Sequence, residues 1–247
     1  AAASEGYKRQ GQGHKMSKSL GNTIAPAEVI KKMGAEIVRL WVSSVDSSAD
    51  VRVSMEAFTK TSDAYKKIRN TVRYMLANTT DFDPKTNGLA YDDLEPADQY
   101  MLIKYNHLVA DLKAKYDSYD FLDIYKQVMN FFISELSAFY LDFAKDILYI
   151  DPEDSHTRRS MQTVLYEMTV GLTKLLTPIL PHTTEENLPF LKEPADYVQL
   201  VEMTTPQHLD NEEAVLKTLD GSMQRQSDVS KALEEGLDAK LIGKPVA

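Results

Sequence analysis

The sequence predicts a mainly α-helical protein, a helical bundle preceded by a loop and shorter helices. Apolar residues recur at steps of three and four over long stretches between residues 54 and 178. Aromatic residues between 116 and 149 follow the same helical period, as expected of a buried core rather than a stacking surface. Only a brief run around residues 51–53 alternates as a strand would.

Composition and charge narrow the class of protein. The chain has 247 residues, 43% of them apolar, and it has no cysteine, so we expect neither disulfides nor a structural metal site. No apolar run approaches the ~20 residues of a membrane span, which predicts a cytoplasmic protein without a membrane partner. The net charge is -9, yet residues 1–80 carry +6 and residues 81–247 carry -15. This asymmetry favours an anionic partner for the first part only.

The first part of the chain predicts three helices. No element is expected before residue 11, because those residues are polar and unpatterned. Pro26 starts a short helix that Gly34 ends, and a second short helix follows through Trp41, which we assign to the core. Ser54 caps a long helix that reaches about Asn78. Its apolar seam consists of Phe58, Thr61, Tyr65, Ile68, Val72 and Met75 or Leu76.

A stretch rich in Pro, Gly and Asp then precedes the predicted bundle. Helices are expected from 96 to 118, from a cap at Asp120 to about 149, and from a cap at Ser155 to Pro178. The run "TTEE" at 183–186 predicts a capping box, "YVQLVEM" an irregular segment, and Asp210 with Glu213 the start of a last helix. The predicted units are 1–53, 54–93, 94–205 and 206–247.

One short run carries the clearest chemical signal. Lys15, Met16, Ser17, Lys18 and Ser19 form a cationic loop between glycines, which on residue types alone suits either an anion site or an ordinary solvated loop. The run matches the KMSKS signature of class I aminoacyl-tRNA synthetases. The stretches "SMEAFTKTSDAYKKIRNTVRYMLAN", "SAFYLDFAKDILY" and "RRSMQTVLYEM" resemble the bacterial isoleucyl members more than the valyl, leucyl or methionyl ones.

The resemblance implies a reaction and roles for the loop residues. The implied reaction is ATP-dependent activation of isoleucine, with Mg²⁺, followed by acyl transfer to tRNA. Lys15 and Lys18 would offset the charge that grows on departing pyrophosphate. Met16, Ser17 and Ser19 would complete the ATP-binding loop, and the neighbouring glycines would let it open and close.

The resemblance also implies contacts with tRNA. Lys66, Arg69 and Arg73 share a helix flank beside the seam, with Lys67 and Asn70 nearby, and together we call them the cationic ridge. These side chains would contact phosphates, although a solvated helix flank explains them about as well. Arg158 and Arg159 would meet the anticodon stem, or else pair with local acids such as Glu153 and Asp154.

We expect the chain to be the C-terminal part of such a synthetase, from the KMSKS loop through the anticodon-binding helices. It has no HIGH motif or editing domain, so the isolated chain is expected to be inactive, to bind no cofactor by itself and to be a monomer. The alternative is a non-catalytic helical domain that binds RNA or another protein.

Overall fold

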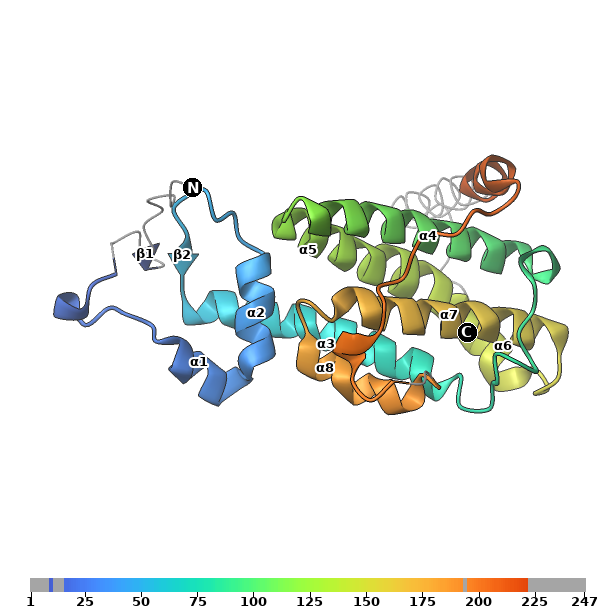
Figure 1. The fold of residues 1–247 in the computed structure, drawn as a ribbon, viewed down its shortest axis with the longest axis horizontal. Coiled ribbons are helices and arrows are strands. Elements are labelled where there is room, and N and C mark those ends of the chain that lie inside the picture. Colours follow the sequence, from blue (N-terminus) through green and yellow to red (C-terminus); the bar gives the residue numbers. More distant parts are fainter. Residues whose placement is uncertain (1–8, 11–15, 193–194, 222–247) are drawn as a thin grey trace, which may run out of the picture.

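The chain folds into a small helical group and a larger bundle, joined by one long helix (Figure 1). The computed structural model describes residues 9–10, 16–192 and 195–221. Between residues 16 and 192 its α-helices are α1 (Pro26–Met33), α2 (Ala35–Ser43), α3 (Met55–Ala77), α4 (Pro96–Asp117), α5 (Phe121–Asn130), α6 (Leu141–Ile150), α7 (His156–Leu176) and α8 (Pro181–Asn187). The predicted mainly helical class is confirmed. Within the described ranges no helix is long and apolar enough to cross a membrane.

The small group is built from α1, α2 and a short sheet. Gly34 separates the two helices with φ 92°, a backbone region that glycine enters without steric cost, so the predicted break is confirmed. The buried cluster consists of Val29, Ile37, Trp41, Val53 and Phe58. Trp41 packs on Phe58 with ring centroids 4.9 Å apart, which confirms its assignment to the core.

The sheet corrects one expectation. The predicted short strand is present as β2 (Arg52–Val53), and it pairs in parallel with β1 (Arg9–Gln10). The expectation that no element precedes residue 11 was therefore wrong. A two-residue polar strand has no periodicity to detect, and it depends on a partner far away in the sequence.

Helix α3 connects the two groups. The Ser54 hydroxyl accepts a hydrogen bond from the Ala57 amide at 3.1 Å, which confirms the predicted cap. Phe58 near its start belongs to the small cluster, whereas Ile68, Val72 and Met75 belong to the large one. One predicted seam therefore serves two cores, and the helix holds them in a fixed relation.

The bundle consists of α4, α7 and a continuous helical stretch from Phe121 to Ile150. The predicted caps are confirmed, because Asp120 accepts from the Asp123 amide and Ser155 from the Arg158 amide. Residues Phe131–Tyr140 form a π-helical segment, which spacing alone did not predict. A π-helix has more residues per turn than an α-helix, so neighbours can share a face. Both Phe131 and Phe132 are buried there, where the sequence left the choice open.

The capping box predicted at 183–186 is wrong. Helix α8 already begins at Pro181, which suits a first helical position because it needs no amide proton there. Thr184 lies inside the helix and donates to the Leu180 carbonyl at 3.0 Å. Thr183 instead reaches Glu36 of the small group, as described below.

A strap formed by residues 201–209 leads to the last described helix (orange to red in Figure 1). It is irregular and follows a 3-10 turn at Val198–Leu200, in line with the irregular segment that was predicted. Asn106 of α4 binds the strap, accepting from the Gln207 amide at 2.6 Å. The last helix runs from 212 to 221, and the remainder of the predicted helix lies outside the described residues.

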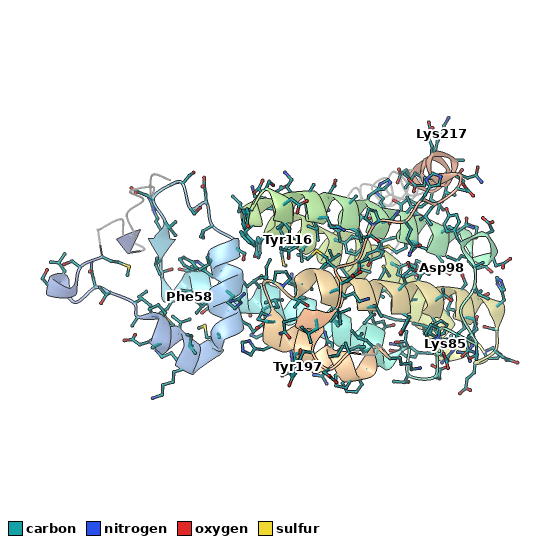
Figure 2. The ribbon with its side chains drawn as sticks, in the orientation of Figure 1. Phe58, Lys85, Asp98, Tyr116, Tyr197 and Lys217 are labelled. Atoms are coloured by element: carbon teal, nitrogen blue, oxygen red, sulfur yellow. The ribbon has the colours of Figure 1, made fainter. Side chains whose placement is uncertain are left out.

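A buried carboxylate sits where three elements of the bundle meet (Figure 2). Asp98 of α4 is 2% exposed. It accepts from the Tyr140 hydroxyl at 2.5 Å and from the Ser160 hydroxyl of α7 at 2.6 Å. Burial raises the pKa of Asp98 to about 6, although both hydrogen bonds oppose the rise.

This carboxylate predicts a pH-dependent stability. Because its pKa is raised in the folded protein, the group stabilises the fold at acid pH, and that contribution is lost as pH rises through the interval from about 4 to 6. Relative to the parent chain, Asp98→Asn should gain about 3 kcal/mol of unfolding free energy between pH 4 and pH 8. Urea unfolding across this range measures it. The exposed Asp111→Asn on the same helix is the control, and parallel curves for Asp98→Asn and the parent would contradict the prediction.

Candidate functional site

The KMSKS loop rests on the small group. Lys15 lies outside the described residues, and so does the side chain of Lys18, whose backbone begins a 3-10 turn at Lys18–Leu20. Met16 is partly buried and packs against the small cluster. Met16 therefore anchors the described part of the motif, and in the sequence Lys15 precedes it and Lys18 follows it.

Polar contacts shape the rest of the loop. The Ser17 amide donates to Asn22 Oδ1 at 2.8 Å, and the Ser17 and Ser19 hydroxyls lie 2.6 Å apart. Gly21, between them and Asn22, has φ 60°. Asn22 was not singled out from the sequence, although a polar residue just after a glycine in a tight loop is a typical signal of side-chain-to-backbone bonding.

The cationic ridge lies along α3 with different degrees of pairing. Lys66 is exposed and binds Asp63 at 3.0 Å, while Arg69 binds Glu186 of α8 at 3.2 Å. Lys67, Asn70 and Arg73 are exposed, and no ion pair of Lys67 or Arg73 occurs within the described ranges. The five residues thus lie on one helix, and Lys67 and Arg73 are exposed and form no ion pair among the residues that the structure describes.

Arg158 and Arg159 are mostly enclosed, with side chains 16% and 15% exposed. Both contact Asp81 in the α3–α4 connection, at 3.1 and 3.4 Å. Arg158 also donates to the Leu148 carbonyl and Arg159 to Gln162. Burial acts to raise the pKa of Asp81, but the bonds from Arg158 and Gln162 together hold it below its usual value.

Of the two predicted alternatives for these arginines, the structure has the pairing with an acid. The acid is Asp81 rather than Glu153 or Asp154. Asp81 lies far from both arginines in the sequence, so spacing gave no signal for it.

A junction joins the small group to the bundle, and sequence reasoning missed it. Glu36 of α2, only 9% exposed, accepts from the His182 amide at 3.1 Å, from its ring Nδ1 at 2.8 Å and from the Thr183 hydroxyl at 3.1 Å. Tyr65 of α3 also bonds Thr183, at 2.8 Å. His182 makes this contact from the first turn of α8.

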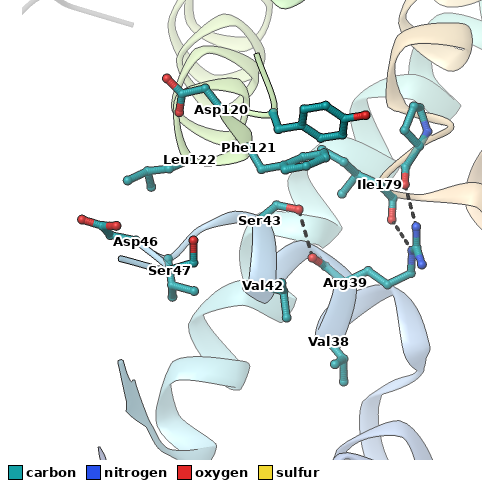
Figure 3. A pocket seen from close by; sticks show the side chains of 13 residues that line it. Val38, Arg39, Val42, Ser43, Asp46, Ser47, Asp120, Phe121, Leu122 and Ile179 are labelled. Carbon is teal, nitrogen blue, oxygen red and sulfur yellow. Dashed lines mark hydrogen bonds between the residues drawn. The ribbon is translucent and has the colours of Figure 1, made fainter. Parts of the chain in front are cut away.

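Arg39, one turn further along α2, completes the junction. Its guanidinium donates to the Ile179 carbonyl at 2.9 Å and to the Pro178 carbonyl at 2.6 Å, beyond the end of α7 (Figure 3). A positive charge at a helix C-terminus also interacts favourably with the helix dipole. A hollow of about 690 Å³ lies beside these contacts, between α2 and the α4–α5 and α7–α8 turns.

Comparison with known families identifies the class of protein to which this loop and this helical bundle belong. Residues 98–239 match the family described as "Anticodon-binding domain of tRNA ligase", and residues 3–54 match "tRNA synthetases class I (I, L, M and V)". The first match spans more than half of the chain. The chain belongs to the family of anticodon-binding domains of tRNA ligases.

Several curated relatives of this chain share one name. The isoleucine–tRNA ligases of Lactiplantibacillus plantarum and Pediococcus pentosaceus are 62% and 59% identical over 241 residues, and that of Lactobacillus acidophilus is 57% identical. Each match covers 98% of this chain and 26% of the relative. The chain therefore spans about a quarter of the length of the curated relatives it matches.

Two solved structures share the fold. One is Agrobacterium radiobacter K84 LeuRS in a ternary complex with tRNA and LeuAMS, with a TM-score of 0.60 and 18% identity over 85% of this chain and 24% of that one. The other is Mycobacterium tuberculosis methionyl-tRNA synthetase in complex with methionyl-adenylate, with a TM-score of 0.62 and 19% identity over 83% of this chain and 42% of that one. At this identity the likeness concerns the fold alone.

The junction predicts a measurable contribution to stability. Glu36→Ala leaves the His182 amide and the Thr183 hydroxyl without their acceptor, so the free energy of unfolding should fall by about 2 kcal/mol. Urea titration of the whole chain gives this value. Glu153→Ala, an exposed carboxylate in a turn, should change it by less than about 0.5 kcal/mol, and equal effects of the two variants would rule out a structural role for the junction.

Proposed function

We propose that this chain acts as part of an isoleucine–tRNA ligase, contributing the KMSKS loop to isoleucine activation and binding tRNA with its helices. The observation that carries the proposal is the 62% identity over 241 residues to a protein named for that activity. The intact loop sequence and its anchor at Met16 support it further. A cytoplasmic monomer fits such a role.

The loop would act in the first chemical step. The carboxylate of isoleucine attacks the α-phosphate of ATP, a new acyl–phosphate bond forms, and pyrophosphate leaves with growing negative charge. Lys15 and Lys18 would bring two ammonium groups to that charge, where fixed cations are most effective in a site closed to water. Hydroxyls of Ser17 and Ser19, already bonded to each other, would add donors.

Mg²⁺ would accompany the phosphates of ATP. This ion prefers oxygen ligands and is commonly bound through substrate phosphates with only one or two carboxylates. The described residues contain no cluster of three or more histidine or acidic side chains that could hold a metal. We assign no magnesium ligand among the described residues and derive no step from the ion.

The helices would bind tRNA, and the predicted division of the chain belongs to the same proposal. In this division the loop ends a catalytic unit, α3 contacts the stem, and residues 94–205 form the anticodon-binding bundle. The exposed Lys67 and Arg73 are the first candidates for phosphate contacts, followed by Lys66, Arg69 and Asn70. Arg158 and Arg159 would need to release Asp81 before they could contact RNA, so we place them last.

The role of the loop predicts the effect of one substitution. In the full-length ligase, Lys18→Ala should lower the rate of ATP–pyrophosphate exchange at least tenfold, that is by more than ~1.4 kcal/mol of barrier. Lys31→Ala, an exposed lysine of α1, is the matched control and should leave the rate unchanged. An unaltered exchange rate for Lys18→Ala would refute the assigned role.

The role of the ridge predicts a salt effect. Binding of the whole chain to tRNA should weaken with salt, and Lys67→Ala with Arg73→Ala should flatten the log–log slope by about 0.7–0.9 per lost phosphate contact. The pair Lys113→Ala and Lys126→Ala, on α4 and α5, is the control of equal charge. Filter binding at several salt concentrations measures the slopes. A flat salt dependence of the parent chain, or no binding, would remove the RNA-binding proposal and favour a protein partner.

A further inference from the structure

The described part of the KMSKS loop is held between two apolar contacts. Met16 before it and Ile24 after it both pack against the small cluster. Residues 17–23 between these anchors include the 3-10 turn, at the end of the molecule away from the bundle (blue, at the left of Figure 1). Leu20, the one large apolar residue of this stretch, is 69% exposed and adds little packing. The shape of the loop between its anchors therefore depends on polar contacts.

Those contacts meet at Ser17, the residue before Lys18. Its amide donates to Asn22 Oδ1 at 2.8 Å, and its carbonyl accepts from the Leu20 amide at 3.2 Å. Its hydroxyl lies 2.6 Å from that of Ser19. Both polar backbone groups of the residue that precedes Lys18 are thus bonded inside the loop, and this fixes the direction in which Lys18 leaves the chain.

Asn22 closes the loop into a ring that spans residues 17–22. The chain turns back toward Ser17 at Gly21, whose φ of 60° lies in the left-handed region that glycine enters without steric cost. A Cβ atom at Gly21 would meet no atom of the described residues within 4 Å, so backbone conformation rather than space decides which residue fits. Without the Asn22 acceptor, residues 17–23 would be held only at their two ends and would gain conformational freedom.

We propose that Asn22 is a positioning residue for Lys18. The proposal rests on the proposed function, in which Lys18 offsets the charge of departing pyrophosphate. A cation whose backbone is already ordered stabilises that charge more than one that must be ordered during the reaction. Asn22 acts through the Ser17 backbone and touches no substrate. Because its bond to Ser17 is only partly buried, its loss should slow the reaction by a moderate factor, about fivefold.

The first test is ATP–pyrophosphate exchange by the full-length ligase. Asn22→Ala should lower kcat about fivefold and leave KM for isoleucine unchanged, because the ordered loop stabilises the transition state and not the bound amino acid. Thr23→Ala, at the exposed neighbouring position, is the matched control and should keep the kcat of the parent enzyme.

Gly21 gives an independent route to the same ring. Gly21→Val should lower kcat to a similar extent as Asn22→Ala, because a β-branched residue is strained at a positive φ. Gly21→Asn should be at least about threefold faster than Gly21→Val, because asparagine tolerates this backbone region. Both side chains have space among the described residues, so the difference between the two variants reports the backbone of the ring.

The second test needs no reaction. Limited digestion of the whole chain with trypsin, followed by mass spectrometry, measures the rate of cleavage after Lys18, which rises when the loop opens locally. Asn22→Ala should raise this rate several-fold relative to cleavage after Lys31 of α1, which reports general unfolding. Asn22→Asp keeps an oxygen acceptor for the Ser17 amide and should be cleaved like the parent chain.

The outcomes separate this proposal from the proposed function. If Lys18→Ala lowers the exchange rate while Asn22→Ala and Thr23→Ala behave alike, the positioning role is overturned and the loop keeps its assigned function. Equal cleavage after Lys18 in Asn22→Ala and in the parent chain also overturns the positioning role. If Lys18→Ala itself leaves the exchange rate unchanged, the proposed function of the loop fails and the positioning role fails with it.

Discussion

One buried carboxylate, Glu36, accepts three hydrogen bonds and thereby fixes the position of the small group relative to the bundle. Its donors are the His182 amide and ring and the Thr183 hydroxyl, at the start of α8. A carboxylate that leaves water regains its lost hydration only when such donors are in place, so the contact is favourable in one geometry and costly in others. Arg39 binds the adjacent carbonyls and limits rotation about that contact. The junction at Glu36 and Arg39 therefore sets the distance between the KMSKS loop and the bundle, and any ligand that contacts both must fit that distance.

Arginine has two different uses in this fold. Arg39, Arg158 and Arg159 donate to backbone carbonyls or to Asp81, and they hold turns and connections in place. The charges of the ridge project from α3 and pair weakly or not at all, since exposed ion pairs contribute little. A count of basic residues cannot separate structural arginines from exposed cations that could bind a ligand. The burial of each side chain and its hydrogen-bond partners do separate them. Weakly paired exposed cations can exchange a carboxylate for a phosphate at low cost.

The sequence predicted what depends on local chemistry. Caps at Ser54, Asp120 and Ser155 and the break at Gly34 were each predicted from one or two residues, because the physics of a helix end lies within a few positions. What failed depends on distant partners. The pairing of Arg9–Gln10 with β2, the binding of Arg158 to Asp81 and the contact of Thr183 with Glu36 join residues far apart in the sequence. The capping box at Thr183 failed because that hydroxyl bonds across the junction and not to its own helix. The residues of the cationic ridge were predicted to share one flank of α3, and they do so because their spacing follows the helical period.

For the proposed RNA partner, the distribution of charge favours one orientation on this surface. Residues 1–80 carry +6 and residues 81–247 carry -15. At physiological salt such fields act over about 8 Å, so an approaching polyanion is repelled by most of the bundle and attracted along α3 and the loop. Like-charge repulsion suppresses poses that place phosphates against the acidic bundle. In the proposed RNA-binding role, the acidic bundle and the basic ridge would act together, because the ridge attracts phosphate and the bundle repels it.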